Sequence, residues 1–172
     1  MKYLLNGEST ERLKFRNLKE SDFDSWLPFH EDSRSSEFWD GLPNDPKTAC
    51  KQQFNRVFER YEQDLGGMNA LICKKTNLLV GLCGLLIQTV DNIEELEIGY
   101  SILPEYWKKG YATEAAKKCK EFAFNTNFRD SLISIIHTDN LPSIKVALAN
   151  GMQPSKTTKY HNNPVQIYRV FN

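Results

Sequence analysis

The spacing of hydrophobic residues changes several times along the first third of the chain, and each change predicts a new element. Residues 11–16 (ERLKFR) alternate between apolar and polar side chains and predict a strand. Ser21 is a candidate N-cap for a short helix that extends to about His30. Residues 33–44 show no clear period. We therefore expect a strand, a short helix and an irregular segment before the first long helix.

The first long helix is predicted by its start signal and by one apolar stripe. Asp45 supplies an N-cap, and Pro46 stands at the first helical position, where its missing N–H costs nothing. The apolar side chains that share the stripe are Cys50, Phe54, Val57, Phe58, Tyr61 and Leu65. Gly66 and Gly67 follow, and we expect a left-handed glycine cap to end the helix there.

Three strands are expected next, because two short polar turns separate three apolar runs. The runs are 69–75, 78–90 and 93–103, and the turns are Thr76-Asn77 and Asp91-Asn92. Such short turns make antiparallel neighbours. In the third run one face carries Leu96, Ile98, Tyr100 and Ile102, and the other carries Glu95, Glu97, Gly99 and Ser101.

The second half of the chain alternates helix and strand. The predicted elements are a helix after Gly110 with an alanine-rich stripe that includes Cys119, a buried strand at 132–137, a helix at 140–150 with Ile144, Ala147 and Leu148 inward, and a last strand at 165–171 at or near an edge. The strand before Gly110, the helix after it and strand 132–137 form a right-handed βαβ unit with parallel strands. The expected fold class is therefore α/β, a mixed sheet with helices on its faces, in a single domain over residues 1–172.

Composition excludes several classes of protein. The 22 acidic and 22 basic residues cancel, so no overall field favours nucleic acid. The longest apolar run is too short for a membrane span, and MKYLLNGEST lacks the features of a signal peptide, so we expect a cytoplasmic protein without a membrane partner. The four cysteines stand singly, without a CxxC pair, and we expect neither a metal site nor a disulfide framework.

The junction LPEYWKKGYAT, residues 103–113, carries the clearest candidate site. A βαβ unit binds its ligand where the first strand leads into the helix, and helix N-terminal N–H groups attract anions. Gly110 lets the backbone approach a ligand closely, while Lys108 and Lys109 add positive charge, so a pyrophosphate is the natural ligand. KKG before a helix is also a common helix start. Neither GxxxxGK[ST] nor GxGxxG is present, which disfavours nucleotide triphosphatases and dinucleotide-binding oxidoreductases.

Three stretches of the chain resemble one known family. EIGYSILPEYWKKGYATEAA (97–116) and HTDNLPSIKVALANGM (137–152) are similar to the GNAT superfamily of acetyl-CoA-dependent N-acetyltransferases. TERLKFRNLKESDFDSW (10–26) resembles the opening of its ribosomal-protein N-terminal acetyltransferase (RimJ/RimL-like) branch. The resemblance covers nearly the whole chain. It implies a strongly curved, mostly antiparallel sheet, a central parallel strand pair that splays apart, and helices on both faces.

The resemblance also implies that acetyl-CoA is the cosubstrate. The family's loop, Gln/Arg-x-x-Gly-x-Gly/Ala, falls on residues 107–112 and departs from the pattern at Trp107. The backbone amides implied to hold the pyrophosphate are those of Lys108, Lys109, Gly110, Tyr111, Ala112 and Thr113. The backbone implied to pair with pantetheine is that of Tyr100 and Ile102, and the side chains implied to lie near pantetheine and the thioester are Asn140 and Ser143.

Transfer of an acetyl group to an amine needs a proton acceptor, a donor for the carbonyl oxygen and close positioning of the reactants. Glu97, on the polar face of its strand, is the candidate base, and Glu95 on the same face is the substitute. The alternative is that Glu97 is only a solvated charge on the strand or the ion-pair partner of a lysine. The Tyr100 amide is the candidate donor. Many GNAT members have a tyrosine acid where this chain has Ala147, so Ser143 or solvent would protonate the thiolate.

The acceptor side is the least determined by sequence. Trp26, Phe38 and Trp39 fall in the region that borders the acceptor in this family, and they are candidate substrate contacts, core residues or dimer contacts. His137 is expected to be a core histidine. The lack of a strong acidic cluster argues against polycationic acceptors. We expect an enzyme, monomer or homodimer, that acetylates a protein N-terminal α-amine or a small primary amine by direct transfer in a ternary complex. The alternative is a GNAT-like module that binds or senses acyl-CoA without turnover, because the tyrosine position is vacant.

Overall fold

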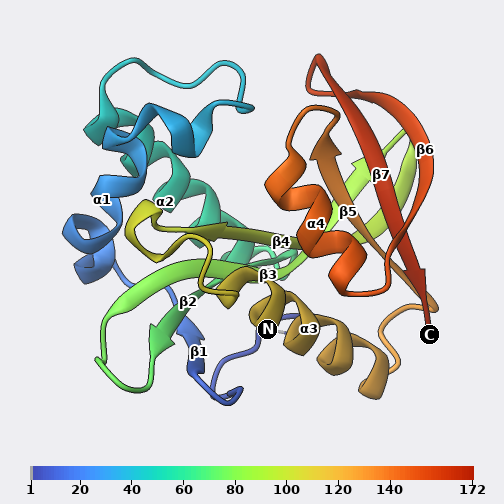
Figure 1. The fold of residues 1–172 in the computed structure, drawn as a ribbon, viewed down its shortest axis with the longest axis horizontal. Helices are drawn as coiled ribbons and strands as arrows, with labels where there is room; N and C mark the ends of the chain where they lie inside the picture. Colours follow the sequence, from blue (N-terminus) through green and yellow to red (C-terminus); the bar gives the residue numbers. More distant parts are fainter. Residues whose placement is uncertain (1) are drawn as a thin grey trace.

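One mixed sheet with the strand order β1-β2-β3-β4-β5-β7-β6 carries the fold (Figure 1). The computed structural model describes residues 2–172. The strands are β1 (Leu13–Asn17), β2 (Gly66–Cys73), β3 (Leu79–Val90), β4 (Ile93–Ile102), β5 (Ser131–His137), β6 (Gln153–Tyr160) and β7 (Asn163–Phe171). The α-helices are α1 (Phe23–Glu31), α2 (Pro46–Glu62), α3 (Tyr111–Asn125) and α4 (Leu141–Ala149).

The sheet is antiparallel except at its centre. Strands β1 to β4 pair antiparallel in chain order, β4 and β5 are parallel, and β7 pairs antiparallel with both β5 and β6. The two predicted turns are confirmed: Asn77, Asp91 and Asn92 have the positive φ angles that tight hairpin turns require. The strands of the C-terminal half run at a steep angle to β2 and β3 (Figure 1). The predicted fold class, a curved mixed sheet with one parallel pair, is confirmed.

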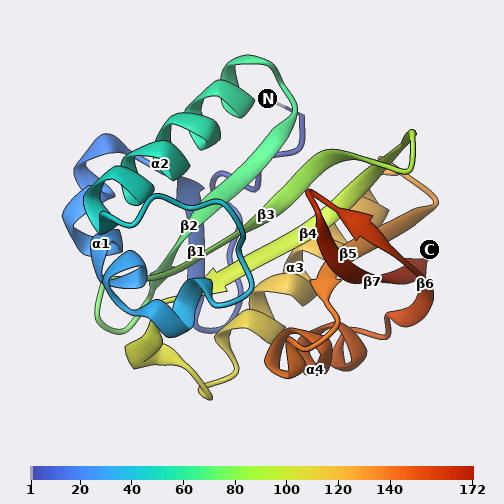
Figure 2. The ribbon, with the colours of Figure 1, turned by 90° about the horizontal axis from the view of Figure 1, so that it is seen from above.

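Helices cover both faces of the sheet, and each face has its own core. Figure 2 shows α1 and α2 on one side of the sheet and α3 and α4 on the other. On the α1–α2 side, Trp26 and Phe54 pack against strand residues such as Leu82. On the other side, the predicted alanine stripe of α3 is buried against the sheet together with Cys119, which has no exposed surface. Small side chains let α3 lie close to β3 and β4, so this helix is positioned tightly under the centre of the sheet.

Three local predictions are wrong. Ser21 lies inside a 3-10 turn, Glu20–Asp22, and does not cap α1. Helix α2 ends at Glu62, with Asp64 in the left-handed conformation, and Gly66 and Gly67 instead begin β2. Glycine is required at 66 because a Cβ atom there would lie 2.0 Å from the Leu85 carbonyl oxygen of the adjacent strand. Leu148, which was predicted to face inward on α4, is instead 46% exposed.

The C-terminal hairpin was only partly anticipated. The last strand, β7, lies near the edge as predicted, but β6 forms the edge itself. Strand β6 alternates exposed and half-buried residues with few apolar side chains, so its sequence carries no strand signal that could be read before the structure was known. No helix in residues 2–172 combines the length and apolar character that crossing a membrane requires.

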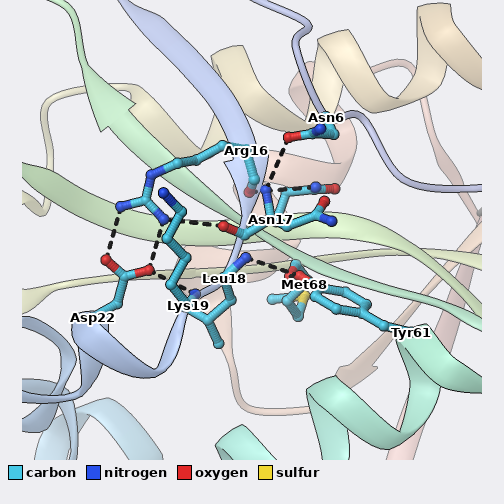
Figure 3. Close-up of polar contacts among 9 residues, drawn as sticks. Asn6, Arg16, Asn17, Leu18, Lys19, Asp22, Tyr61 and Met68 are labelled. Atoms are coloured by element: carbon cyan, nitrogen blue, oxygen red, sulfur yellow. Dashed lines mark hydrogen bonds and ion pairs between the residues drawn. The ribbon is translucent and has the colours of Figure 1, made fainter.

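A polar network ties the end of β1 to both N-terminal helices (Figure 3). The Arg16 guanidinium donates two hydrogen bonds to the Asp22 carboxylate, at 2.6 and 2.8 Å. The Tyr61 hydroxyl accepts a hydrogen bond from the Leu18 amide and donates one to the Met68 carbonyl. Because these bonds link β1, α1, α2 and β2, they hold α2 in place along one wall of the cavity described below.

Candidate active site

The parallel strands β4 and β5 touch at one register position and then part. Their bridge joins Glu97 and Ile133, and the Ser134 hydroxyl donates to the Ile98 carbonyl at 2.9 Å. Since backbone groups alternate sides along a strand, the N–H and C=O of Tyr100 face the same gap as those of Ile98. The Ile102 carbonyl faces it too, but it accepts a hydrogen bond from the Trp107 indole at 2.7 Å. The gap therefore presents strand-edge donors and acceptors at the position expected for Tyr100 and Ile102.

The N-terminus of α3 opens beside this gap and carries no side-chain cap. Gly110 stands at the N-cap position in the left-handed conformation, φ 80°, and the preceding Lys108 is also left-handed, φ 60°. The first helical backbone bond runs from the Glu114 amide to the Gly110 carbonyl. The amides of residues 111–113 therefore have no acceptor within the helix. Lys108 and Lys109 are exposed at its mouth. This arrangement suits an anion.

Arg12, which the sequence did not single out, braces the loop. Its Nη1 donates to the Lys109 carbonyl at 2.9 Å, and its Nε donates to the Glu114 carboxylate at 2.6 Å. The guanidinium also lies 4.6 Å from the Tyr111 ring centroid. Arg12 thus adds to the helix mouth a guanidinium that is paired with the Glu114 carboxylate and comes from almost one hundred residues earlier in the chain. Such a distant contact leaves no local sequence signal.

A cavity of about 630 Å3 lies on the other side of the gap, and we call it the central cavity. Its walls come from α2, β3, β4, β5, the start of α4, the segment after α1 and the β6–β7 turn. The lining residues that were predicted as site residues are Phe38, Trp39, Glu97, Tyr100, Asn140 and Ser143. These predicted residues come from three separate segments, and the structure brings them together around one space.

Glu97 is held at the inner end of the central cavity by a side-chain relay. The Gln88 amide nitrogen donates to Glu97 Oε2 at 2.7 Å, and the Tyr160 hydroxyl donates to Gln88 Oε1 at 3.1 Å. Burial raises the pKa of Glu97 above its ordinary value of 4.5, while Gln88, the Ile135 amide and Arg60 oppose the rise. A carboxyl with a raised pKa is suited to exchange protons near neutral pH. Glu95, the substitute, is held in a two-bond pair by Arg169 outside the cavity.

The polar groups near the parting strands are partly engaged with one another. The Tyr100 hydroxyl donates to the Ser143 carbonyl at 2.8 Å, and burial raises the pKa of Tyr100, so this hydroxyl stays protonated. Asn140 caps α4, since its Oδ1 accepts from the Ser143 amide at 3.2 Å. Ala147, at the position of the family's tyrosine, is 1% exposed and belongs to the core.

The three aromatic candidates for substrate contact separate into two groups. Phe38 and Trp39 line the central cavity, and the Phe38 ring stacks on His137 with centroids 4.9 Å apart. Trp26 has no exposed surface, and its indole donates to the Gln53 carbonyl oxygen at 2.7 Å. Trp26 is therefore a core residue behind the cavity wall, which corrects its assignment as a direct contact. His137 was expected in the core, yet it lines the cavity.

The sequence analysis also missed Arg56, Arg60, Gln88 and Tyr160, which all line the cavity. The two arginines stand four residues apart on α2, and this spacing, which puts both on one helix face, was the only available signal. Tyr160 comes from the unanticipated β6. Within residues 2–172, no group of three or more His, Cys, Asp or Glu side chains is placed to hold a metal ion.

Comparison with known proteins agrees with this geometry. The chain is 37% identical over 95 residues to YkkB of Bacillus subtilis, and that match covers 55% of each protein, so it reaches only about half the length of this relative. An acetyltransferase from Agrobacterium tumefaciens has the same fold, with a TM-score of 0.80 and 23% identity over 96% of this chain and 94% of that one. RimJ of Mycobacterium smegmatis, in complex with a CoA disulfide, matches with a TM-score of 0.75 and 14% identity over 92% and 81% of the two chains.

The family model described as "Acetyltransferase (GNAT) domain" matches residues 12–153. This span includes the loop at Gly110, the parting strands and most of the cavity walls. Because the match covers far more than half of the sequence, the chain belongs to the GNAT acetyltransferase family.

Proposed function

We propose that this chain is an acetyl-CoA-dependent N-acetyltransferase that acetylates a primary amine by direct transfer in a ternary complex, with residues 1–172 as its single domain. The observation that carries the proposal is the convergence of three features. An uncapped helix N-terminus at Gly110, a gap between β4 and β5, and a cavity lined by the half-buried Glu97 all adjoin strand β4. Location in the cytoplasm and the monomeric or dimeric state stay predictions.

The residues at the gap fit coenzyme A. The amides of Tyr111, Ala112 and Thr113, with Lys108, Lys109 and Arg12 around them, would hold the pyrophosphate. Gly110 has no Cβ atom, so a phosphate can approach the backbone closely there. The Tyr100 backbone and the Ile102 N–H would pair with pantetheine in the gap, as a strand does at a sheet edge.

Acetyl-CoA supplies an acetyl group activated as a thioester. The protein positions the two reactants, removes a proton from the amine and stabilises the negative charge that develops on the carbonyl oxygen. Glu97, directly or through water, takes the proton that the attacking amine must lose. The Tyr100 amide faces the gap and can donate to the carbonyl oxygen as negative charge develops there. Ser143 or solvent returns a proton to the departing thiolate, since Ala147 has no acidic group. The central cavity holds both reactants together, which supplies a large part of the rate.

Two measurements test this proposal. Isothermal titration of the chain with acetyl-CoA should give saturable binding, and release of free thiol should follow when a panel of primary amines is added. Absence of binding at millimolar acetyl-CoA would contradict the coenzyme site. A specific observation keeps a second candidate open: the family's tyrosine acid is replaced by the buried Ala147. Binding of acetyl-CoA without thiol release on any amine would favour an acyl-CoA-sensing module over an enzyme.

A further inference from the structure

The inner end of the central cavity contains an arginine that the acetyl-transfer chemistry does not use. Arg60 stands in the last turn of α2 and lines the cavity. Its Nη2 donates to the backbone carbonyls of Leu65 at 2.8 Å and of Ile87 at 2.5 Å, which fixes the guanidinium in place. A guanidinium has five N–H donors, more than these two acceptors use. Arg60 is therefore a fixed positive charge with donor capacity that the protein does not fill.

Arg60 lies beside the candidate base. Ile87, whose carbonyl it holds, precedes Gln88, and the Gln88 amide donates to Glu97 at 2.7 Å. Arg60 and Glu97 attract each other electrostatically, yet each makes its polar contacts with neutral partners. A positive and a negative group thus stand close together at the end of one cavity. Arg56, one turn earlier on α2, adds a second positive charge nearer to solvent.

We propose, on the basis of the proposed function, that the acceptor is an amine with a carboxylate only a few bonds from its nitrogen. Arg60 binds the carboxylate, and Glu97 takes the proton from the amine. Arg60 bonds to Ile87 and Glu97 bonds to Gln88, the next residue, so the two protein groups flank one point of β3, and this favours an α- or β-amino-acid arrangement. Both N–H groups of Arg60 Nη2 are already used, so the donor for a carboxylate is Nη1, for which the described residues provide no acceptor. A hydrogen bond from this charged group to a carboxylate is stronger than one between neutral groups.

Acceptors without an anionic group fit this end of the cavity less well. A simple alkylamine or a polyamine leaves the Arg60 charge uncompensated while its own solvation is lost. The carboxylate itself has two sources, the α-carboxylate of a free amino acid or the acidic side chain of a peptide's first residue. Both present the same chemistry to Arg60, and the substrates in the test distinguish them.

The test measures thiol release from acetyl-CoA with matched acceptor pairs. One arm compares free amino acids with their α-carboxamides. The other compares short peptides that begin with Asp or Glu with those that begin with Asn or Gln. We expect kcat/KM to be at least about tenfold higher for the acid of the preferred pair, as one charge-assisted pair supports. The arm that shows the preference identifies the source of the carboxylate.

Variants then assign the preference to Arg60. Arg60→Gln should reduce the acid-to-amide ratio to about one through a higher KM for the acid, while Arg60→Lys retains part of the preference because it keeps the charge. Lys51→Gln, on the exposed face of the same helix and outside the cavity, removes an equal charge and should leave the ratio unchanged. Titration with acetyl-CoA shows whether each variant is folded and binds coenzyme. If Arg60→Gln does not fold, the wild-type ratio and Arg60→Lys decide.

Three outcomes overturn the inference. They are equal rates on acids and amides, an Arg60→Gln variant that keeps the wild-type ratio, and turnover of simple amines with none of the acids. The first two leave the proposed function intact, since thiol is still released. Failure to bind acetyl-CoA would instead overturn the proposed function itself.

Discussion

The mouth of α3 offers a direct test of the coenzyme site, because one substitution places a negative charge there. Gly110→Asp puts a carboxylate where we propose that a pyrophosphate binds. The side chain has room, since the atom nearest to a Cβ at this position is Arg12 Nη2 at 3.4 Å. The backbone φ of 80° costs a residue other than glycine about 1 kcal/mol, but Asp and Asn tolerate it better than most. Gly110→Asn therefore has the same shape and backbone cost without the charge.

The difference between the two variants isolates electrostatic repulsion. Two phosphate charges about 5 Å from a carboxylate repel it by about 1.7 kcal/mol in total at the dielectric constant of water, and by more if water is excluded. Arg12, beside the new carboxylate, offsets part of any increase. We therefore expect coenzyme A to bind Gly110→Asp about 2 kcal/mol, or roughly thirtyfold, more weakly than Gly110→Asn.

Isothermal titration at two salt concentrations measures this difference. The defect of Gly110→Asp should shrink between about 0.1 and 1 M salt, because the screening length falls from about 10 to about 3 Å. Thermal unfolding of both variants checks that the loop change has not damaged the fold. Equal affinities for Gly110→Asp and Gly110→Asn would refute the assignment of this loop to the pyrophosphate.

Four further predictions, on three variants, address other parts of the protein. Glu97→Gln should lower turnover strongly with little effect on coenzyme binding, and wild-type kcat/KM should rise with pH through an apparent pKa above 4.5; an unchanged rate across pH would exclude this base. Because burial raises the folded pKa of Glu97, its ionisation opposes folding as pH rises above 4.5, so Glu97→Gln should unfold at higher temperature than wild type at pH 7 to 8 and not at pH 4. Arg12→Gln should weaken coenzyme binding up to about tenfold while kcat at saturating coenzyme is kept; a loss of kcat alone would contradict its place at the loop. Trp26→Phe should reduce the free energy of unfolding by about 1 kcal/mol, because the Gln53 side-chain oxygen loses one of its two donors and keeps His30, and leave the acceptor KM unchanged; a raised KM at unchanged stability would restore Trp26 as a substrate contact.

Elements with a strong local signal were predictable from the sequence. Asp45 and Pro46 start α2 as expected, and the turns at Asn77 and Asp91 join antiparallel strands. In each case the deciding interaction lies within a few residues of the signal. The end of α2 was mispredicted because Gly66 serves a contact with Leu85 of another strand, nineteen residues away, and not a helix cap. A glycine looks the same in the sequence for either purpose.

The features of the candidate site also fall into two groups, those set by neighbouring residues and those set by contacts between distant segments. The sequence by itself determined the loop at Gly110, the alternation that turns Glu97 to the face of the sheet opposite α3, and the short helix that follows Asn140, because these depend on neighbouring residues. Only the tertiary structure decided which side chains surround Glu97. Arg60 and Tyr160 reach it from elements far away in the chain, and their positions are set by how the helices and the C-terminal hairpin pack on the curved sheet. Packing depends on contacts between distant segments, and a local pattern carries no record of them.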